Sequence, residues 1–304
     1  MPTVTIAMPC YNHARFLPEA VASVVGQTFA DWELVIVDAG STDDSAAVAA
    51  RLIDRFAGRR IRLLRQAATG PGAARNAALR DSSAPFALAL DADDMLDARF
   101  LEQTLPLLQN DSSLGFITTE VCFFGAEHGS WSGGKPSAAR MIYDCRTTAT
   151  ALFRRAAWAE AGGFCERREW QRYEDWDFWL RLIERGYCGE LLPAPLFWYR
   201  RGRGSSLATS QRNDIIYRAR IVIDHPTLYP WGFAAWAAGV EADVSRGERR
   251  SLRWHAHYCA LLAHHAPHEL PKALLRPLFK ALGPHPQMYA RALAQHLQIS
   301  RPGG

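Results

Sequence analysis

The segment Glu33-Leu34-Val35-Ile36-Val37-Asp38 holds four consecutive apolar residues and ends in a carboxylate. An apolar run without polar alternation predicts a strand that is covered on both faces, as in a parallel sheet. Strand and helix signals alternate around it; the strands are Thr3–Met8, Ile61–Leu64 and Phe86–Leu90, and the helices are Arg15–Gln27, 41–56 and Ala73–Arg80. Ser41 and Thr42 are the expected N-cap of the helix over 41–56. The alternation predicts an α/β fold with a doubly wound, mostly parallel sheet flanked by helices.

The pattern becomes looser after about residue 100. Helices are predicted at Phe100–Leu108, 150–161 and Trp176–Glu184, and strands at Phe116–Phe124 and Leu191–Tyr199. After Ser206 the strand signals mostly vanish, and helix-length segments are broken by prolines. These changes predict three parts, which are 1–100, 101–205 and a C-terminal helical extension over 206–304.

The composition is that of a folded protein. Of the 304 residues, 48% are apolar, which excludes a disordered or fibrous chain. The net charge of +4 is too small to indicate nucleic acid as a partner. The six cysteines are scattered without a Cys-x-x-Cys pair, which favours reduced thiols over disulfides or a zinc site. The sequence shows neither a signal peptide nor an apolar run of about 20 residues, so we expect a cytoplasmic location.

Acidic residues follow two of the predicted strands. Asp38 ends the quoted segment, and Asp91, Asp93 and Asp94 come directly after a later strand. In open α/β sheets, ligands bind beyond the carboxyl ends of the strands. Carboxylates this close together repel each other unless a cation joins them, and a hard divalent ion takes oxygen ligands. We therefore expect a metal and a nucleotide at Asp91 and Asp93, while the alternative role of capping the next helix suits Asp97 and also Asp94.

A set of ordered motifs runs along the first two thirds of the chain. They are Ile6–Asn12, Gln27–Asp43, Gly72–Ala78, Leu90–Asp94, and Gly162–Phe164 followed by Tyr173–Asp177. In this order and spacing they resemble the family 2 glycosyltransferases, which are inverting enzymes with the GT-A fold. The resemblance covers about residues 3–205, and the last hundred residues are not matched.

The resemblance implies transfer of a sugar from a nucleotide-diphosphate donor to a hydroxyl of a glycan or lipid-linked acceptor. It makes 1–100 the nucleotide-sugar-binding half of a GT-A domain and 101–205 the acceptor-binding half. The residues that it implies for donor binding are Pro9, Tyr11, Asp38, Arg75, Asp91 and Asp93. Within this set, Asp93, with Asp91 near the ribose, is the expected ligand of Mg²⁺ or Mn²⁺ on the diphosphate.

The resemblance also points to the residue that activates the acceptor. Asp175, in the pair Glu174-Asp175, matches the family's Glu-Asp motif and is the expected catalytic base. An ordinary helix N-terminus is the alternative, since acidic residues there favour the helix dipole. Arg75 likewise has an alternative interpretation, as a charge on a helix surface.

Two residues depart from the family pattern. Ala39 stands where many members have an aspartate that contacts uracil, so the donor nucleotide stays open among UDP, GDP and dTDP. Gly202 stands where many have a histidine in a Tyr-Arg-x-His arrangement. Arg200, Arg201 and Arg203 either hold the diphosphate in its place or form solvated surface.

The tail carries the positive charge, with 12 lysines and arginines against 6 acidic residues over 206–304. In Lys272–Leu282, cations recur every four residues beside an apolar side, as in a helix that lies on an anionic membrane surface. Such a helix could make peripheral contact with the inner face of the membrane, but packing of its apolar side on the catalytic domain is the favoured interpretation. The histidines between 255 and 268 lack metal-ligand spacing and are expected on a helix surface.

Two other functions stay open from the sequence. One is a non-catalytic nucleotide-sugar-binding protein. The other is a sugar-phosphate nucleotidyltransferase, which needs a Gly-rich loop with Arg or Lys after the first strand, unlike Pro9-Cys10-Tyr11-Asn12-His13. The three lysines beside 32 arginines indicate a GC-rich, bacterial genome, and bacterial members of the family commonly build polysaccharide or the cell envelope.

Overall fold

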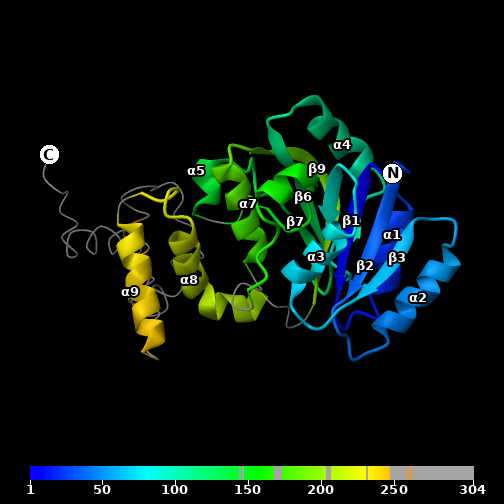
Figure 1. The fold of residues 1–304 in the computed structure, drawn as a ribbon, viewed down its shortest axis with the longest axis horizontal. Coiled ribbons are helices and arrows are strands. Elements are labelled where there is room, and N and C mark those ends of the chain that lie inside the picture. Colours follow the sequence, from blue (N-terminus) through cyan, green and yellow to red (C-terminus); the bar gives the residue numbers. More distant parts are fainter. Residues whose placement is uncertain are drawn as a thin grey trace, which may run out of the picture. The chain divides into compact units, whose positions relative to one another are not determined.

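The computed structural model describes residues 1–143, 145, 147–167, 173–202, 207–230, 232–246, 258 and 261. The chain divides into two compact units, Met1–Ser205 and Ser206–Gly304. The first unit is built on one sheet with helices packed against it (Figure 1).

Nine strands form this sheet within the described residues. They are β1 (Val4–Cys10), β2 (Trp32–Asp38), β3 (Ile61–Arg65), β4 (Phe86–Ala89), β5 (Met95–Leu96), β6 (Leu114–Gly125), β7 (Gly129–Trp131), β8 (Leu152–Arg154) and β9 (Cys188–Arg201). Their order is β3-β2-β1-β4-β8-β6-β9-β5, and β7 pairs with β6. The pairs among β1 to β4 are parallel, which confirms the α/β arrangement predicted for the first hundred residues. Beside β4 the direction reverses, because β8 is antiparallel to both β4 and β6.

Seven helices of the first unit connect and cover the strands that the structure describes. They are α1 (Leu17–Val25), α2 (Ser45–Arg55), α3 (Pro71–Arg80), α4 (Phe100–Asn110), α5 (Ala138–Met141), α6 (Arg155–Glu160) and α7 (Glu174–Glu184). The helices predicted before residue 110 are all present. The predicted N-cap of α2 is wrong, however, because Ser41 and Thr42 bond to Asn12 in the preceding loop and the helix begins at Ser45.

The helix predicted over 150–161 is also wrong in its first half. Leu152–Arg154 forms β8, which lies between β4 and β6, and only Arg155–Glu160 is helical. Leu152 and Phe153 are fully buried in this position. Hydrogen bonds to strands on both sides outweigh a local helix preference, which is a weak determinant by itself.

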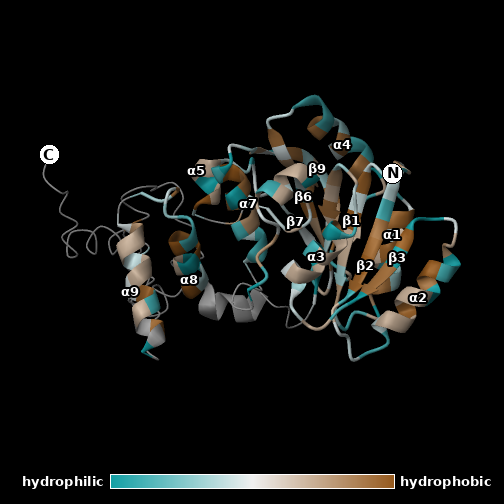
Figure 2. Ribbon diagram, in the orientation of Figure 1, coloured by the Kyte–Doolittle hydropathy of each residue, from teal (hydrophilic) through white to brown (hydrophobic). Residues whose placement is uncertain are grey.

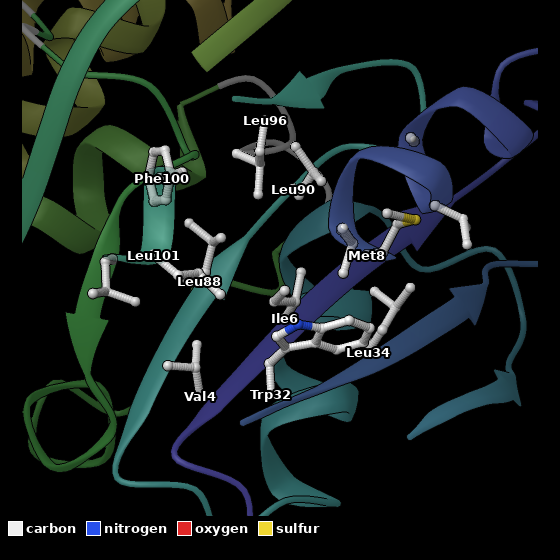
Figure 3. Packing of buried hydrophobic residues seen from close by; sticks show 14 of the residues in the cluster. Val4, Ile6, Met8, Trp32, Leu34, Leu88, Leu90, Leu96, Phe100 and Leu101 are labelled. Carbon is white, nitrogen blue, oxygen red and sulfur yellow. The ribbon is translucent and has the colours of Figure 1, made fainter. Parts of the chain in front are cut away.

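The core of the first unit covers both faces of the central strands. Along β1, Val4, Ile6 and Met8 point into one apolar cluster together with Leu34 and Leu88 of the neighbouring strands (Figure 3). All four apolar residues of the segment over 34–37 are fully buried, as their lack of polar alternation predicts. Figure 2 shows the apolar residues gathered on these strands. The packed strands give a rigid base for the loops that follow them.

The second unit contains α8 (Leu207–Asp224) and α9 (Phe233–Ser245), which pack on each other. Phe233 and Trp236 contact the ring of Tyr258, with centroids 5.7 and 4.7 Å away. None of the helices that the structure describes is long and apolar enough to cross a membrane. The amphipathic stretch Lys272–Leu282 and the histidines between 255 and 268 lie outside the described residues.

Candidate active site

The loops after β1, β2 and β4 meet at one edge of the sheet because these strands run in the same direction. Cys10, at the end of β1, is in register with Asp38, at the end of β2. Asn12 joins their two loops: its Oδ1 accepts the Thr42 N–H at 2.7 Å, and its own N–H donates to Ser41 Oγ at 3.0 Å. Asn12 has a φ of 58°, a left-handed conformation that asparagine tolerates. Asn12 lies in the first of the family-like motifs, but the sequence predicted no role for it.

The predicted nucleotide residues from β1 and β2 lie around this junction. Pro9 is half-buried, and Tyr11 in the following loop is 51% exposed. Asp38 is buried, with Oδ1 accepting the Ser41 N–H at 3.1 Å and Oδ2 3.5 Å from Arg65 Nε. Asp38 therefore carries a fixed carboxylate at the strand end.

Three carboxylates crowd the turn after β4. The side chains of Asp91 and Asp93 are 40% and 33% exposed, whereas Asp94 is buried. The turn is closed by the Asp94 N–H, which donates to the Asp91 carbonyl at 3.1 Å. Burial and the charge of Asp91 raise the pKa of Asp93, and burial and the charge of Asp93 raise the pKa of Asp94 well above its ordinary value. A bound cation would relieve this repulsion.

The capping role considered for Asp97 and Asp94 is wrong, because the N-cap of α4 is Arg99 and no side chain caps the helix. Asp97 lies two residues before Arg99 and accepts its N–H at 3.0 Å. Asp94 instead accepts the backbone N–H of Arg200 in β9 at 2.8 Å. Asp94 is therefore a link between the acidic turn and β9.

The acidic turn fits a metal that is also held by its substrate. In the described part of the chain, no three His, Cys, Asp or Glu residues form a complete protein cage for a metal. Mg²⁺ typically takes one or two carboxylates, keeps several waters and completes its shell with substrate phosphates. Asp93, with Asp91 beside it, offers partly exposed carboxylates of that kind.

Arg75 connects this turn to α7. It lies on α3 and is almost completely buried, so the alternative of a surface charge does not describe it. One terminal nitrogen donates to Asp91 Oδ1 at 2.8 Å and the other to Glu174 Oε1 at 2.7 Å. Burial alone would lower the pKa of Arg75, but the two carboxylates outweigh it and raise the pKa. The sequence analysis assigned no role to Glu174. The only sequence signal for it was its place in the Glu-Asp motif.

Asp175 follows in the first turn of α7. Its side chain is half-buried, and Oδ1 accepts the Trp176 N–H at 2.8 Å. Burial is the main cause that raises the pKa of Asp175 to about 7, with a further increase from Glu174 and an opposing effect of Arg75. Asp91 also contributes to this shift, so Asp175 and the acidic turn belong to one electrostatic site. A carboxylate that titrates near neutrality is suited to act as a general base.

Asn76, the neighbour of Arg75, braces the loop that precedes α7. Its Nδ2 donates to the Phe164 carbonyl and its Oδ1 accepts the Phe164 N–H, both at 2.8 Å. Oδ1 also accepts from Trp158 Nε1 at 3.0 Å. Gly163 has a φ of 80°, and a Cβ there would come within 2.7 Å of Asn76 Oδ1. Gly163 of the Gly-Gly-Phe motif thus allows the close packing against Asn76 of α3.

The basic residues near the end of β9 lie in different environments. Arg200 donates through Nε to the Asp93 carbonyl at 2.8 Å. Arg201 lies over the ring of Phe123, with Nε 3.3 Å from Glu127 Oε2. Arg203 lies outside the described residues.

Tyr199, which the sequence did not single out, lies beside the acidic turn. Burial, followed by the charge of Asp94, raises its pKa to about 12. Its phenol therefore stays protonated beside the carboxylates.

Comparisons with known proteins bear on this geometry. The model of a protein family described as glycosyl transferase family 2 matches residues 5–157. A 120-residue stretch is 36% identical to the UDP-Glc:alpha-D-GlcNAc-diphosphoundecaprenol beta-1,3-glucosyltransferase WfgD of Escherichia coli, covering 39% of this chain and 46% of that enzyme. The match thus spans less than half of that relative's length.

Solved structures share the fold at low sequence identity. TarS 1–349 of S. aureus in complex with UDP-GlcNAc has a TM-score of 0.64 and 18% identity, over 97% of this chain and 88% of that one. The mannosyltransferase PcManGT of Pyrobaculum calidifontis, in complex with GDP-Man and Mn²⁺, has a TM-score of 0.58 and 18% identity, over 99% and 81%.

Proposed function

The chain belongs to glycosyl transferase family 2 and is a glycosyltransferase with the GT-A fold, and on this basis we propose that it is an inverting enzyme. It transfers a sugar from a nucleotide-diphosphate donor to a hydroxyl of a glycan or lipid-linked acceptor. Its place is in bacterial polysaccharide or cell-envelope biosynthesis, at the cytoplasmic side. The name of the E. coli relative, a glucosyltransferase that acts on a lipid diphosphate, supports this class of acceptor.

The contact of Arg75 with two carboxylates carries the proposal. Asp91 belongs to the turn that receives the donor, and Glu174 is the neighbour of the proposed base. Because both bond to one buried guanidinium, the donor-binding turn and the base-bearing helix are held at a fixed separation. Transfer between two substrates needs such a fixed arrangement.

The proposed reaction moves one proton and one glycosyl group. Asp175 takes the proton of the acceptor hydroxyl as its oxygen attacks the anomeric carbon from the face opposite the nucleotide. The bond from that carbon to the diphosphate oxygen breaks, and its electron pair leaves with the nucleoside diphosphate. Attack from the opposite face inverts the configuration.

Asp93, with Asp91, is the proposed holder of Mg²⁺ or Mn²⁺. When bound, the cation offsets the negative charge that develops on the departing diphosphate. The solved structure of the mannosyltransferase that shares the fold is a complex with GDP-Man and Mn²⁺, which supports a divalent cation here. The residues proposed to contact the nucleotide are Pro9, Tyr11 and Asp38. The identity of the nucleotide base stays unassigned, because Ala39 replaces the aspartate that contacts uracil in many family members.

The test compares donor binding with turnover. Thermal shift with UDP, GDP and dTDP sugars and Mn²⁺ identifies the donor, since a bound ligand stabilises the folded protein. Release of nucleoside diphosphate with a mixed glycan and lipid-linked acceptor pool then measures transfer. We expect Asp175→Asn to lose turnover by a factor of about 10²–10⁴ while donor affinity stays close to that of the wild type.

The assignment of the metal ligands is tested by separate experiments. Asp93→Asn and EDTA should both abolish transfer, whereas Asp97→Asn, a matched change near the same turn, should not. Full activity in EDTA would remove the metal from the proposal. Collapse of donor affinity in Asp175→Asn, with bound donor still turned over, would make Asp175 a binding group.

A further inference from the structure

Arg200 of β9 holds the acidic turn at two points. Its backbone N–H donates to Asp94 Oδ1, and its Nε donates to the carbonyl oxygen of Asp93, each at 2.8 Å. Both acceptors lie directly after the Asp93 Cα along the chain, one on Asp93 itself and one on the next residue. The backbone that carries the Asp93 carboxylate is therefore held from β9 as well as from the turn itself.

The guanidinium of Arg200 is itself held firmly. Its carbon lies 4.6 Å from the ring centre of Phe16 and 4.2 Å from that of Phe124. A terminal nitrogen also pairs with Glu19 of α1. The side chain is 15% exposed. An arginine enclosed between two rings and a carboxylate has little surface left for a phosphate.

We propose that Arg200 is a positioning residue that keeps Asp93 in the orientation that binds the metal on the donor diphosphate. This inference rests on the proposed function, because the metal ligand is assigned there. In this proposal Arg200 does not contact the diphosphate directly, which was one of the two interpretations open from the sequence. It acts through the backbone of Asp93. Residues that orient metal ligands typically change metal affinity about 10- to 100-fold when they are replaced.

The experiment measures Mn²⁺ affinity directly. Mn²⁺ is titrated into the full-length protein with saturating UDP, GDP or dTDP in separate experiments, and free Mn²⁺ is followed by its electron paramagnetic resonance signal. Arg200→Met keeps the apolar stem and the backbone bond to Asp94 but removes the charge and the side-chain donors. We expect its dissociation constant for Mn²⁺ to rise about 10- to 100-fold. Arg200→Lys keeps the charge between the rings and should give an intermediate value.

A matched control separates positioning from general stabilisation. Arg155 also lies over a ring, that of Trp158, and donates to a carbonyl, that of Leu79, at the opposite end of β4. Arg155→Met should leave the Mn²⁺ affinity unchanged even if its melting temperature falls. A merely structural Arg200 would behave in the same way.

The outcomes are distinguishable. If the wild-type protein does not bind Mn²⁺ in the presence of any of the three nucleotides, the proposed metal site is overturned, and the role of Arg200 with it. Wild-type binding that Arg200→Met retains in full would overturn the role of Arg200 alone. If Arg200→Met does not fold, Arg200→Lys decides, because it lacks the planar set of donors, and unchanged affinity in that variant contradicts the proposal.

Discussion

Asp175 is surrounded by groups that act on its charge in opposite directions. Burial and Glu174 disfavour the ionised form, whereas Arg75 favours it, and the resulting pKa is about 7 against an ordinary 3.8. A base must be ionised before it accepts a proton. The same carboxylate therefore links activity and stability to pH with opposite signs.

We predict that kcat/KM rises with pH through about 7 as Asp175 loses its proton. The free energy of unfolding changes the other way. Between pH 4 and 7 the folded protein binds more protons at Asp175 than the unfolded chain does, so the stability that Asp175 contributes is lost as the pH rises. Thermal melts of wild type and Asp175→Asn over this range check the sign. The wild type should lose stability relative to the variant, and parallel curves would contradict the raised pKa.

The sequence predicted a role for single residues where a charged residue lies in a motif. Asp91, Asp93 and Asp175 were expected to act at one site, and their roles there are still proposals. Glu174 and Arg200 were not assigned their present contacts, because a carboxylate or cation in a sequence does not reveal its partner. Glu174 contacts a residue 99 positions away, and Arg200 one 107 positions away, distances at which sequence spacing carries no signal.

At the scale of elements, α3 and the loop before α7 depend on each other. Gly162 and Gly163 both have a φ of 80°. A Cβ at Gly162 meets nothing within 4 Å, whereas one at Gly163 comes within 2.7 Å of Asn76 Oδ1. The two glycines therefore form a matched pair that separates backbone strain from loss of contact.

We predict that Gly162→Ala costs about 1–2 kcal/mol of folding free energy, from its left-handed backbone alone. Gly163→Ala should cost at least about 1 kcal/mol more, because it also disturbs the buried hydrogen bonds of Asn76. Urea denaturation of both variants measures the difference. Equal losses of folding free energy in the two variants would show that Asn76 can move aside without destabilising the protein.

Elements were predictable where local periodicity and long-range pairing agree. The parallel strands and helices of the first hundred residues satisfy both. Residues 152–154 do not: their sequence allows a helix, but a place between two strands makes them β8. The start of α2 was misplaced for a similar reason, since Asn12 uses Ser41 and Thr42 in a contact between loops.

On the scale of the whole molecule, every described residue of the candidate site belongs to the unit Met1–Ser205. We predict that a chain ending at residue 205 keeps its affinity for Mn²⁺ and nucleoside diphosphate within a few-fold of the full-length value, about 1 kcal/mol. A chain ending at residue 187 lacks β9 and should lose that affinity. Titration of both checks this, and a folded 1–205 fragment without binding would place part of the donor site in the tail.

The contact between Arg200 and the Asp93 carbonyl spans 107 residues of chain, and this separation has a meaning in time. A ribosome adds about 5–20 residues per second, so the acidic turn is synthesised roughly 5–20 s before Arg200. During that interval the parallel strands can already pair, but β9 is missing from the sheet. Nascent chains therefore acquire the braced acidic turn only near the end of translation of the first unit, and we expect prematurely terminated products that lack β9 not to bind nucleotide sugar.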